Sequence, residues 1–265
     1  MIGVALRGLA SRKLRAALTA FAIVLGVSMV SGTYVLTDTI EKAFTALFAE
    51  TYAETDARIA GKAADIGIAE ETTDRPAISE GLLEDVRGLP GVAAAAGTVV
   101  DDETLLVDGE GQAIGGETFA LGVDLAPELE RFSPTELVTG SWPTGPNELV
   151  LDAGTAEREA YRVGDTIGVA QDGPTEDFDV VGIARYGGVD SVGSASFAVF
   201  DLETAQELVG KRGELDEIFV ARKAGTSAEE LVSQLAAALP RTVEVQTGAE
   251  AAQEETEEVS VFVDY

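Results

Sequence analysis

The stretch AALTAFAIVLGVSMVSGTYVL, residues Ala16–Leu36, runs for 21 residues without a charged side chain. A helix of that length is about 31 Å long, which matches the hydrocarbon core of a bilayer. The 15 residues before it contain basic side chains and no acid; the basic residues are Arg7, Arg12, Lys13 and Arg15. By the positive-inside rule the N-terminus is cytoplasmic and everything after Leu36 lies outside the plasma membrane. We predict a transmembrane helix at residues 16–36.

Two other interpretations of this stretch are open. In a cleaved signal peptide the apolar part usually runs for about 7–15 residues and ends in an A-x-A-like site. Here it is longer, and Ser31-Gly32-Thr33 matches such a site poorly. If the stretch were a buried helix of a soluble protein, the basic residues before it and the acidic excess after it would be coincidental. We therefore favour an uncleaved membrane helix.

The segments on either side of the span have patterns of their own. Residues 1–15 alternate apolar and basic side chains, which predicts a cytoplasmic amphipathic segment on anionic head groups. Residues 37–54 carry an apolar stripe at helical spacing and predict an extracytoplasmic stalk helix. This helix either starts anew at a capping box of Asp38 and Glu41 or continues the membrane helix. The stripe consists of Ile40, Phe44, Leu47 and Phe48.

Small residues four apart occur within the span, at the spacing that lets membrane helices approach closely. They are Ala22 with Gly26, and Ser28 with Gly32. They either form a packing face or are merely tolerated in lipid.

The composition excludes several classes of function. The chain has 265 residues, a net charge of −29 and no His or Cys, yet a mean hydropathy of +0.14. Residues 37–265 hold 14 basic and 47 acidic residues, a net charge of −33 outside the membrane. Such an acidic surface argues against nucleic-acid partners. Without His or Cys there is no Ser-His-Asp triad, no thiol nucleophile and no imidazole or thiolate zinc site.

Beyond residue 55, short β-type and helical segments alternate, which predicts an α+β ectodomain of two mixed α/β lobes. The first lobe comprises residues 55–126 and 215–247, the inserted second lobe 127–214, and 248–265 form a return segment toward a further membrane helix. A hairpin loop is predicted at Asp108–Glu117, and helix starts at Ser79 and at Ser227 with Glu230. The predicted strands are Asp56–Ala60, Asp65–Ala69, Val92–Val100, Glu103–Val107, Thr118–Val123, Glu148–Leu151, Thr166–Val169, Phe178–Ala184, Ser196–Phe200, Glu217–Ala221 and Thr242–Gln246. The predicted helices are Ser79–Gly88, Ala153–Tyr161, Leu202–Val209 and Ser227–Leu239.

No motif singles out catalytic, cofactor-binding or metal-binding residues. Gly109, Gly111 and Gly115 miss the G-x-G-x-x-G spacing, and Gly210-Lys211-Arg212 lacks the rest of a phosphate-binding loop. The run Asp101-Asp102-Glu103 lacks the spacing of a calcium loop and is interpreted as a solvated turn. A carboxylate pair for glycoside hydrolysis needs only two acids, and nothing singles out a pair. Trp142 is interpreted as a loop anchor or a contact for a partner.

The stretch LRGLASRKLRAALTAFAIVLGVSMVSGTYVLTDTI, Leu6–Ile40, resembles the start of FtsX-like/MacB-like ABC transporter permease subunits, with Leu18-Thr19, Ile23, Leu25 and Gly26 in matching places. Short stretches of the ectodomain resemble the MacB-like periplasmic core domain of that family. They are LPGV (Leu89–Val92), LVTGSWPTGPNELVLDAGTA (Leu137–Ala156), VGDTIGV (Val163–Val169), FDVVGIA (Phe178–Ala184) and FDLETAQEL (Phe200–Leu208). Trp142 departs from the family, which often has Arg or another polar residue after the Gly.

The resemblance implies a permease subunit and not an enzyme. It implies a cytoplasmic ABC ATPase subunit, a second permease subunit in a homo- or heterodimer, the lipid bilayer and an extracytoplasmic cargo or partner. Ectodomain motion would then follow ATP hydrolysis and drive export or activate an outside partner, with partner contacts expected in residues 127–214. Two alternatives remain open: a single-span membrane-anchored binding or sensor domain, and a secreted hydrolase that uses only carboxylates.

Overall fold

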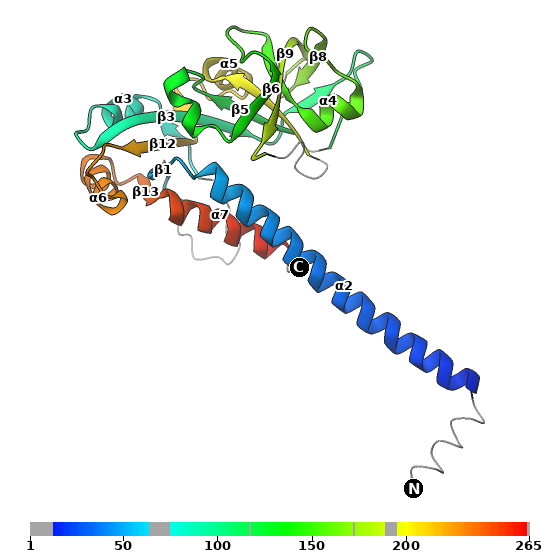
Figure 1. The fold of residues 1–265 in the computed structure, drawn as a ribbon. Coiled ribbons are helices and arrows are strands. Elements are labelled where there is room, and N and C mark those ends of the chain that lie inside the picture. The colour runs from blue at the N-terminus through cyan, green and yellow to red at the C-terminus, as the bar shows by residue number, and fades with distance from the viewer. Residues whose placement is uncertain (1–12, 64–74, 117, 172, 189–194, 264–265) are drawn as a thin grey trace. The chain divides into compact units, whose positions relative to one another are not determined.

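The computed structural model describes residues 13–63, 75–116, 118–171, 173–188 and 195–263. These residues fall into two compact units (Figure 1). The first contains helix α2 (Lys13–Thr51) as far as Ala46 and helix α7 (Gly248–Val263) from Glu254 onward. The second unit runs from Leu47 to Gln253 and holds all the strands found among the described residues. The predicted strand at Asp65–Ala69 lies outside the described residues.

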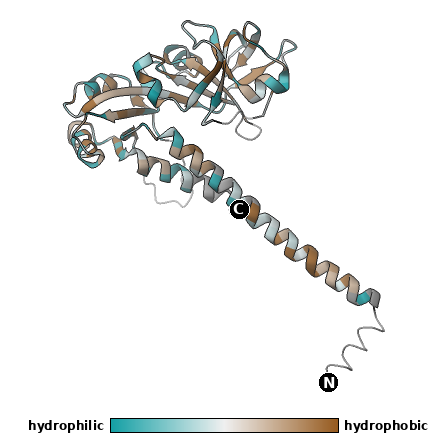
Figure 2. Cartoon of the chain, in the orientation of Figure 1, coloured by the Kyte–Doolittle hydropathy of each residue, from teal (hydrophilic) through white to brown (hydrophobic). Residues whose placement is uncertain are grey.

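Helix α2 is continuous from Lys13 to Thr51. Among the described residues it is the one helix long and apolar enough to span a bilayer, over Ala17–Thr51. Its apolar side chains from Leu18 to Val35 are more than half exposed, and Figure 2 shows the apolar run along its length. The hydroxyls of Thr19 and Thr33 each donate to the carbonyl oxygen four residues earlier, at 3.0 Å. Polar groups in lipid need such internal partners.

The helix does not restart after the apolar stretch. No break separates residues 16–36 from the predicted stalk, so the expectation of a continuing helix is confirmed and the alternative start at Asp38 is wrong. Asp38 instead pairs with Lys42 one turn later, at 2.7 Å.

The second unit is built on an eleven-stranded sheet. Ten strands follow the order β13-β1-β12-β3-β5-β10-β7-β9-β8-β4, and β6 pairs with β9 beside this path. The pairs β5–β10 and β7–β9 are parallel, and the others are antiparallel. The strands are β1 (Ala57–Gly61), β3 (Val92–Asp101), β4 (Leu105–Val107), β5 (Thr118–Val123), β6 (Thr135–Gly140), β7 (Glu148–Asp152), β8 (Thr166–Ala170), β9 (Glu176–Tyr186), β10 (Ser196–Asp201), β12 (Glu217–Arg222) and β13 (Val243–Thr247). A separate pair joins β2 (Ile78–Ser79) to β11 (Glu214–Leu215).

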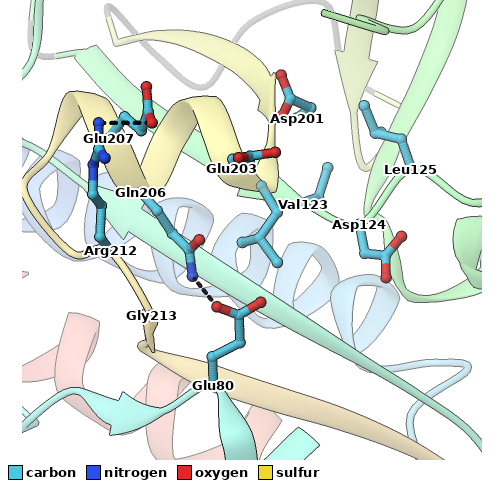
Figure 3. A pocket seen from close by; sticks show the side chains of 11 residues that line it. Glu80, Val123, Asp124, Leu125, Asp201, Glu203, Gln206, Glu207, Arg212 and Gly213 are labelled. Carbon is cyan, nitrogen blue, oxygen red and sulfur yellow. Dashed lines mark hydrogen bonds and ion pairs between the residues drawn. The ribbon is translucent and has the colours of Figure 1, made fainter. Parts of the chain in front are cut away.

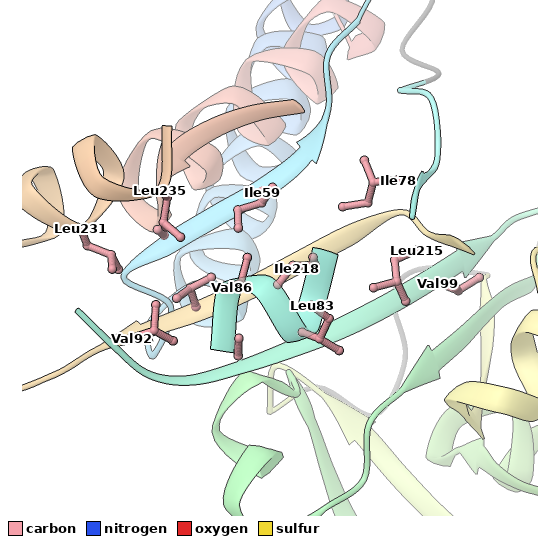
Figure 4. Close-up of a cluster of buried hydrophobic side chains, with 13 residues drawn as sticks. Ile59, Ile78, Leu83, Val86, Val92, Val99, Leu215, Ile218, Leu231 and Leu235 are labelled. Carbon is pink, nitrogen blue, oxygen red and sulfur yellow. The ribbon is translucent and has the colours of Figure 1, made fainter. Parts of the chain in front are cut away.

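Two apolar cores lie at different parts of this sheet. One gathers side chains from β1, β3 and β12 under α3 (Gly81–Arg87) and α6 (Ala228–Ala238), as Figure 4 shows. The other lies among β4, β5, β7–β10, α4 (Ala153–Glu159) and α5 (Leu202–Leu208), with Phe178 and Phe200 edge to face at 5.2 Å. The predicted bounds of the two lobes stay a prediction.

Most predicted segments agree with the structure to within two or three residues. The predicted hairpin at Asp108–Glu117 is wrong, because β4 pairs with β8 and β5 pairs with β3 and β10. The predicted N-cap Ser79 is also wrong: it lies in β2, and helix α3 starts after Glu80 without a side-chain cap. Ser227 is confirmed as the N-cap of α6, where its hydroxyl accepts from the N–H of Glu230 at 3.1 Å.

Candidate functional site at the junction of α2 and the sheet

Helix α2 is anchored to the sheet by an aromatic cluster at its C-terminal end. Tyr52 follows the last helical residue, is 7% exposed and packs edge to face on Phe219 of β12, with ring centroids 5.8 Å apart. Phe132, the last residue of η1 (Pro127–Phe132), stacks on the same Phe219 at 6.5 Å. We call these residues and their buried neighbours the junction cluster: Tyr52, Ala96, Leu129, Phe132, Phe219, Ala221 and Ala251. It brings together the end of α2, the sheet, η1 and the start of α7.

The last turn of α2 has a second contact, with the end of β9. Leu47 lies against Gly187, so closely that a Cβ at this glycine would come within 2.6 Å of Leu47 Cδ1. Gly187 also has a φ of 54°, a conformation that glycine adopts without strain. The hydroxyl groups of Thr51 and Tyr186 lie 3.4 Å apart. The helix end therefore touches the sheet at β12 and at β9.

The connection between α2 and β1 passes against the start of α7. The N–H of Gly248 donates to the carbonyl of Asp56 at 3.3 Å. A side chain on Gly248 would overlap the carbonyl oxygen of Thr55. Helix α7 begins with a reciprocal capping box: Thr247 Oγ1 accepts from the N–H of Glu250 at 3.2 Å, and the Glu250 carboxylate accepts from the N–H of Thr247 at 2.9 Å. This cap holds the start of α7 in place beside the connection.

A buried ion pair lies on the same sheet face as the junction cluster. Arg58 of β1 is 4% exposed, and its Nε donates to Glu217 Oε1 of β12 at 2.7 Å. Arg58 stands opposite Phe219 in the ladder. Removing one member of such a pair leaves a charge in a poorly solvated site. A basic residue within an otherwise apolar strand was the one sequence signal for this pair.

On its solvent side the connection carries two ion pairs, in which Glu54 is 63% exposed and Asp56 23% exposed. Glu54 accepts from Arg131 of η1 at 3.0 Å, and Asp56 accepts from Arg222 at 2.6 Å. The guanidinium of Arg131 also lies over the ring of Phe132, 5.6 Å from its centroid. These pairs border a hollow of about 400 Å³, which Lys223 lines as well. The connection is therefore closely packed on one side. On its other side lie charged groups and open space.

A second hollow, of about 550 Å³, opens beside α5. Acids predominate on its walls, and Figure 3 shows two of them in polar contacts: Glu80 with Gln206 at 3.3 Å and Glu207 with Arg212 at 2.7 Å. Asp201 caps α5 through the N–H of Thr204 at 3.1 Å. In the described parts of the chain no three such side chains converge to hold a metal ion.

The acidic run and the glycine-containing motifs noted in the sequence lie in turns of the structure. Asp101 Oδ2 accepts from the N–H and the hydroxyl of Thr104, at 2.9 and 2.6 Å, which confirms the interpretation as a turn. Gly111 follows the carboxylate of Asp108, which accepts from the N–H groups of Glu110 and Gln112 at 2.9 Å. Lys211 pairs with Asp216 at 2.8 Å. Trp142 packs partly buried against the apolar cluster of Val150, Ala184, Phe197 and Val199, as a loop anchor does.

One buried carboxylate stands apart from the junction. Asp152 is fully buried at the start of α4, where it accepts from the N–H of Thr155 at 2.7 Å and from the N–H of Phe197 at 3.2 Å. Burial raises the pKa of Asp152 above its ordinary value, and the hydrogen bonds from Thr155 and Phe197 oppose this shift. The residue joins β7, α4 and β10.

Comparisons with known proteins agree with this fold. Residues 16–238 match the model of the MacB-like periplasmic core domain. The periplasmic region of MacB from Actinobacillus actinomycetemcomitans superposes with a TM-score of 0.55 at 11% identity, covering 76% of this chain and 92% of that one. The extracellular domain of the noncanonic ABC-type transporter YknZ from Gram-positive bacteria gives a TM-score of 0.49 at 13% identity, covering 71% and 98%. The comparison with curated proteins finds no match.

The family match confirms the resemblance seen in the sequence and the predicted mixed α/β fold with an N-terminal apolar helix. It spans residues 16–238 of 265, far more than half of the chain. The chain therefore belongs to the family of MacB-like periplasmic core domains.

Proposed function

We propose that this chain is part of an ABC transporter permease subunit and transmits the motion of its membrane helix to the ectodomain. The observation that carries the proposal is the uninterrupted path from the apolar segment of α2 to the junction cluster. Helix α2 has no break between its apolar segment and Thr51, so the membrane segment and the residue before Tyr52 belong to one hydrogen-bonded helix. The match to the MacB-like periplasmic core domain and the fold shared with the periplasmic region of MacB support the same transporter class.

In this proposal the energy comes from a separate cytoplasmic ATPase subunit, and the chain is not an enzyme. The N-terminus is cytoplasmic because its basic residues precede the span, and the ectodomain with its −33 charge lies outside. Ectodomain motion would drive the export of a substrate or activate an outside partner.

The test is nucleotide-dependent hydrogen exchange on the full-length permease, purified with any ATPase subunit that accompanies it. We expect exchange around Tyr52 and Phe219 to differ between the ATP-bound and nucleotide-free complexes. An ATPase variant unable to bind nucleotide is the control, and it should remove the difference. An ATPase that co-purifies but changes no exchange in the ectodomain would refute the coupling. Absence of any ATPase would favour the membrane-anchored sensor instead.

A second permease subunit is also proposed, with Gly26 in the helix contact. Apart from the backbone of α2 itself, none of the described residues lies within 4 Å of a Cβ placed on Gly26, so we expect Gly26→Leu to leave the fold of this chain intact. The bulkier side chain prevents close approach of a partner helix. We expect Gly26→Leu to abolish co-purification of two differently tagged copies, or of a heterologous partner, in detergent. Val27→Leu is the matched control, and unchanged assembly of Gly26→Leu would exclude this face.

A further inference from the structure

The connection between α2 and β1 has one closely packed side and one open side. On the packed side, Gly248 leaves no room for a side chain next to Thr55, and Tyr52 is enclosed by the junction cluster. On the open side is the hollow of about 400 Å³, lined by Ala53, Glu54, Asp56, Arg131, Arg222, Lys223 and Ala224. The open space beside the connection is therefore the hollow on this second side.

Weak contacts hold the connection on its open side. The side chains of Glu54 and Arg131 are 63% and 39% exposed, and exposed pairs contribute about 0.2–1 kcal/mol. Asp56 is held more firmly, because it accepts both the N–H and the guanidinium of Arg222. Glu54 is thus the charged group of the connection that is most easily released.

A second cation borders the same hollow. Lys223 follows Arg222 in the chain, its backbone N–H donates to the carbonyl of Gly91 at 2.8 Å, and its ammonium makes no ion pair with any residue that the structure describes. Its flexible stem can reach across open space, whereas Arg131 is held by its contact with Phe132. Glu54 and Lys223 therefore line the same hollow, where Lys223 is a second cation available to a carboxylate that leaves Arg131.

We propose that Glu54 is a charge switch with two cationic partners, Arg131 in the structure and Lys223 across the hollow. The exchange allows the connection to occupy two positions at small cost in free energy, as a two-state element requires. Its role in transmission rests on the proposed function, but the switch itself belongs to the folded ectodomain.

The experiment measures amide hydrogen exchange of Thr55 and Asp56 in the full chain in detergent, without an ATPase, so that its failure leaves the coupling proposal untouched. The variants are Glu54→Gln, Arg131→Gln, Lys223→Gln and the double Arg131→Gln/Lys223→Gln, at low salt. If the two cations substitute for each other, each single cation variant changes exchange less than twofold. The double variant then matches Glu54→Gln, with exchange faster by up to about fivefold, the equivalent of about 1 kcal/mol.

Three outcomes overturn the switch. If Arg131→Gln alone changes exchange as much as Glu54→Gln and Lys223→Gln adds nothing, Glu54 has a single fixed partner. If Arg131→Gln changes exchange more than Glu54→Gln, the effect comes from the other contacts of Arg131, with the Phe132 ring and the Glu54 carbonyl. If Glu54→Gln leaves exchange unchanged, the Glu54 carboxylate does not hold the connection. In all variants the amide of Glu230, at the cap of α6, reports whether the fold is intact.

Discussion

The two faces of β1 and β12 are packed in different ways. One face is aliphatic: Ile59 and Ile218 meet Leu231 and Leu235 of α6, all fully buried. The other face carries the junction cluster, which is aromatic, together with the Arg58–Glu217 pair. Close packing of aliphatic side chains leaves little room for displacement, whereas the junction face joins side chains from the connection after α2, from η1, from the sheet and from α7. The comparison suggests that α6 and α3 stabilise the sheet, while the opposite face connects it to α2.

The largest expected effect concerns the buried pair on the junction face. Glu217→Gln removes the carboxylate that Arg58 contacts, and we expect it to lower the free energy of unfolding by about 3–5 kcal/mol. The double variant Arg58→Met/Glu217→Leu, which removes both charges, is the control. It should recover most of that loss in urea titrations, because neither charge is then left buried. A double variant as unstable as Glu217→Gln would show that the pair stabilises this face through more than its charges.

The aliphatic face should respond to lost volume. Leu235→Ala leaves a cavity in a fully buried site and should cost about 2–5 kcal/mol in the same titration. Ala236→Ser, at an exposed position of the same helix, is the control and should stay within about 0.5 kcal/mol of the wild type. The exchange of Thr55 at the junction should remain unchanged in Leu235→Ala. A parallel change there would mean that the two faces do not act separately.

Asp152 is a buried carboxylate at the start of α4, and its pH response tests the effect of burial. Its pKa is raised in the folded state, so the folded protein binds this proton more tightly than the unfolded chain does. The stability of the wild type relative to Asp152→Asn should therefore rise as the pH falls from neutral toward 4, by at most about 1.4 kcal/mol per pH unit. Denaturant titrations of both proteins from pH 7 to 4 measure the difference. A difference that falls with decreasing pH would contradict the effect of burial.

The smallest effects concern the caps of the helices on the two faces. Ser227→Ala and Thr247→Ala each remove the hydroxyl that starts α6 and α7, respectively, and each should cost about 1 kcal/mol. Hydrogen exchange separates them, because Thr247→Ala should also speed exchange at Gly248, beside the connection. Ser227→Ala should leave Gly248 unchanged. If the exchange rate of the Gly248 amide changes equally in both variants, the two faces of the sheet do not respond separately.

Local patterns predicted most elements for a physical reason. Short, mostly apolar segments marked strands such as Thr118–Val123, whose bounds agree with β5. The capping spacing of Ser227 and Glu230 marked the start of α6. The two-residue strands β2 and β11 were not predicted. So short a strand has no sequence pattern of its own, because it depends on pairing with its partner. Strand β6 was also not predicted, since most of its side chains are exposed and no alternation marks it.

The junction could not be predicted in the same way. Tyr52 and Phe219 are 167 positions apart, and Arg58 and Glu217 are 159 apart. The sequence around one member of each pair does not indicate the other member, because each residue lies in a local helix or strand pattern that is common in proteins. Only the pairing of β1 with β12 brings them to the same face.

By itself the sequence determined the apolar helix, the charge asymmetry around it and the order of most strands and helices, because these depend on neighbouring residues alone. The tertiary structure decided which strands pair, sending β4 to β8 and not to β5, and it assembled the junction at the end of α2. Strand pairing depends on burying side chains that are far apart in the sequence. A one-residue shift in register would turn the buried side chains of a strand outward.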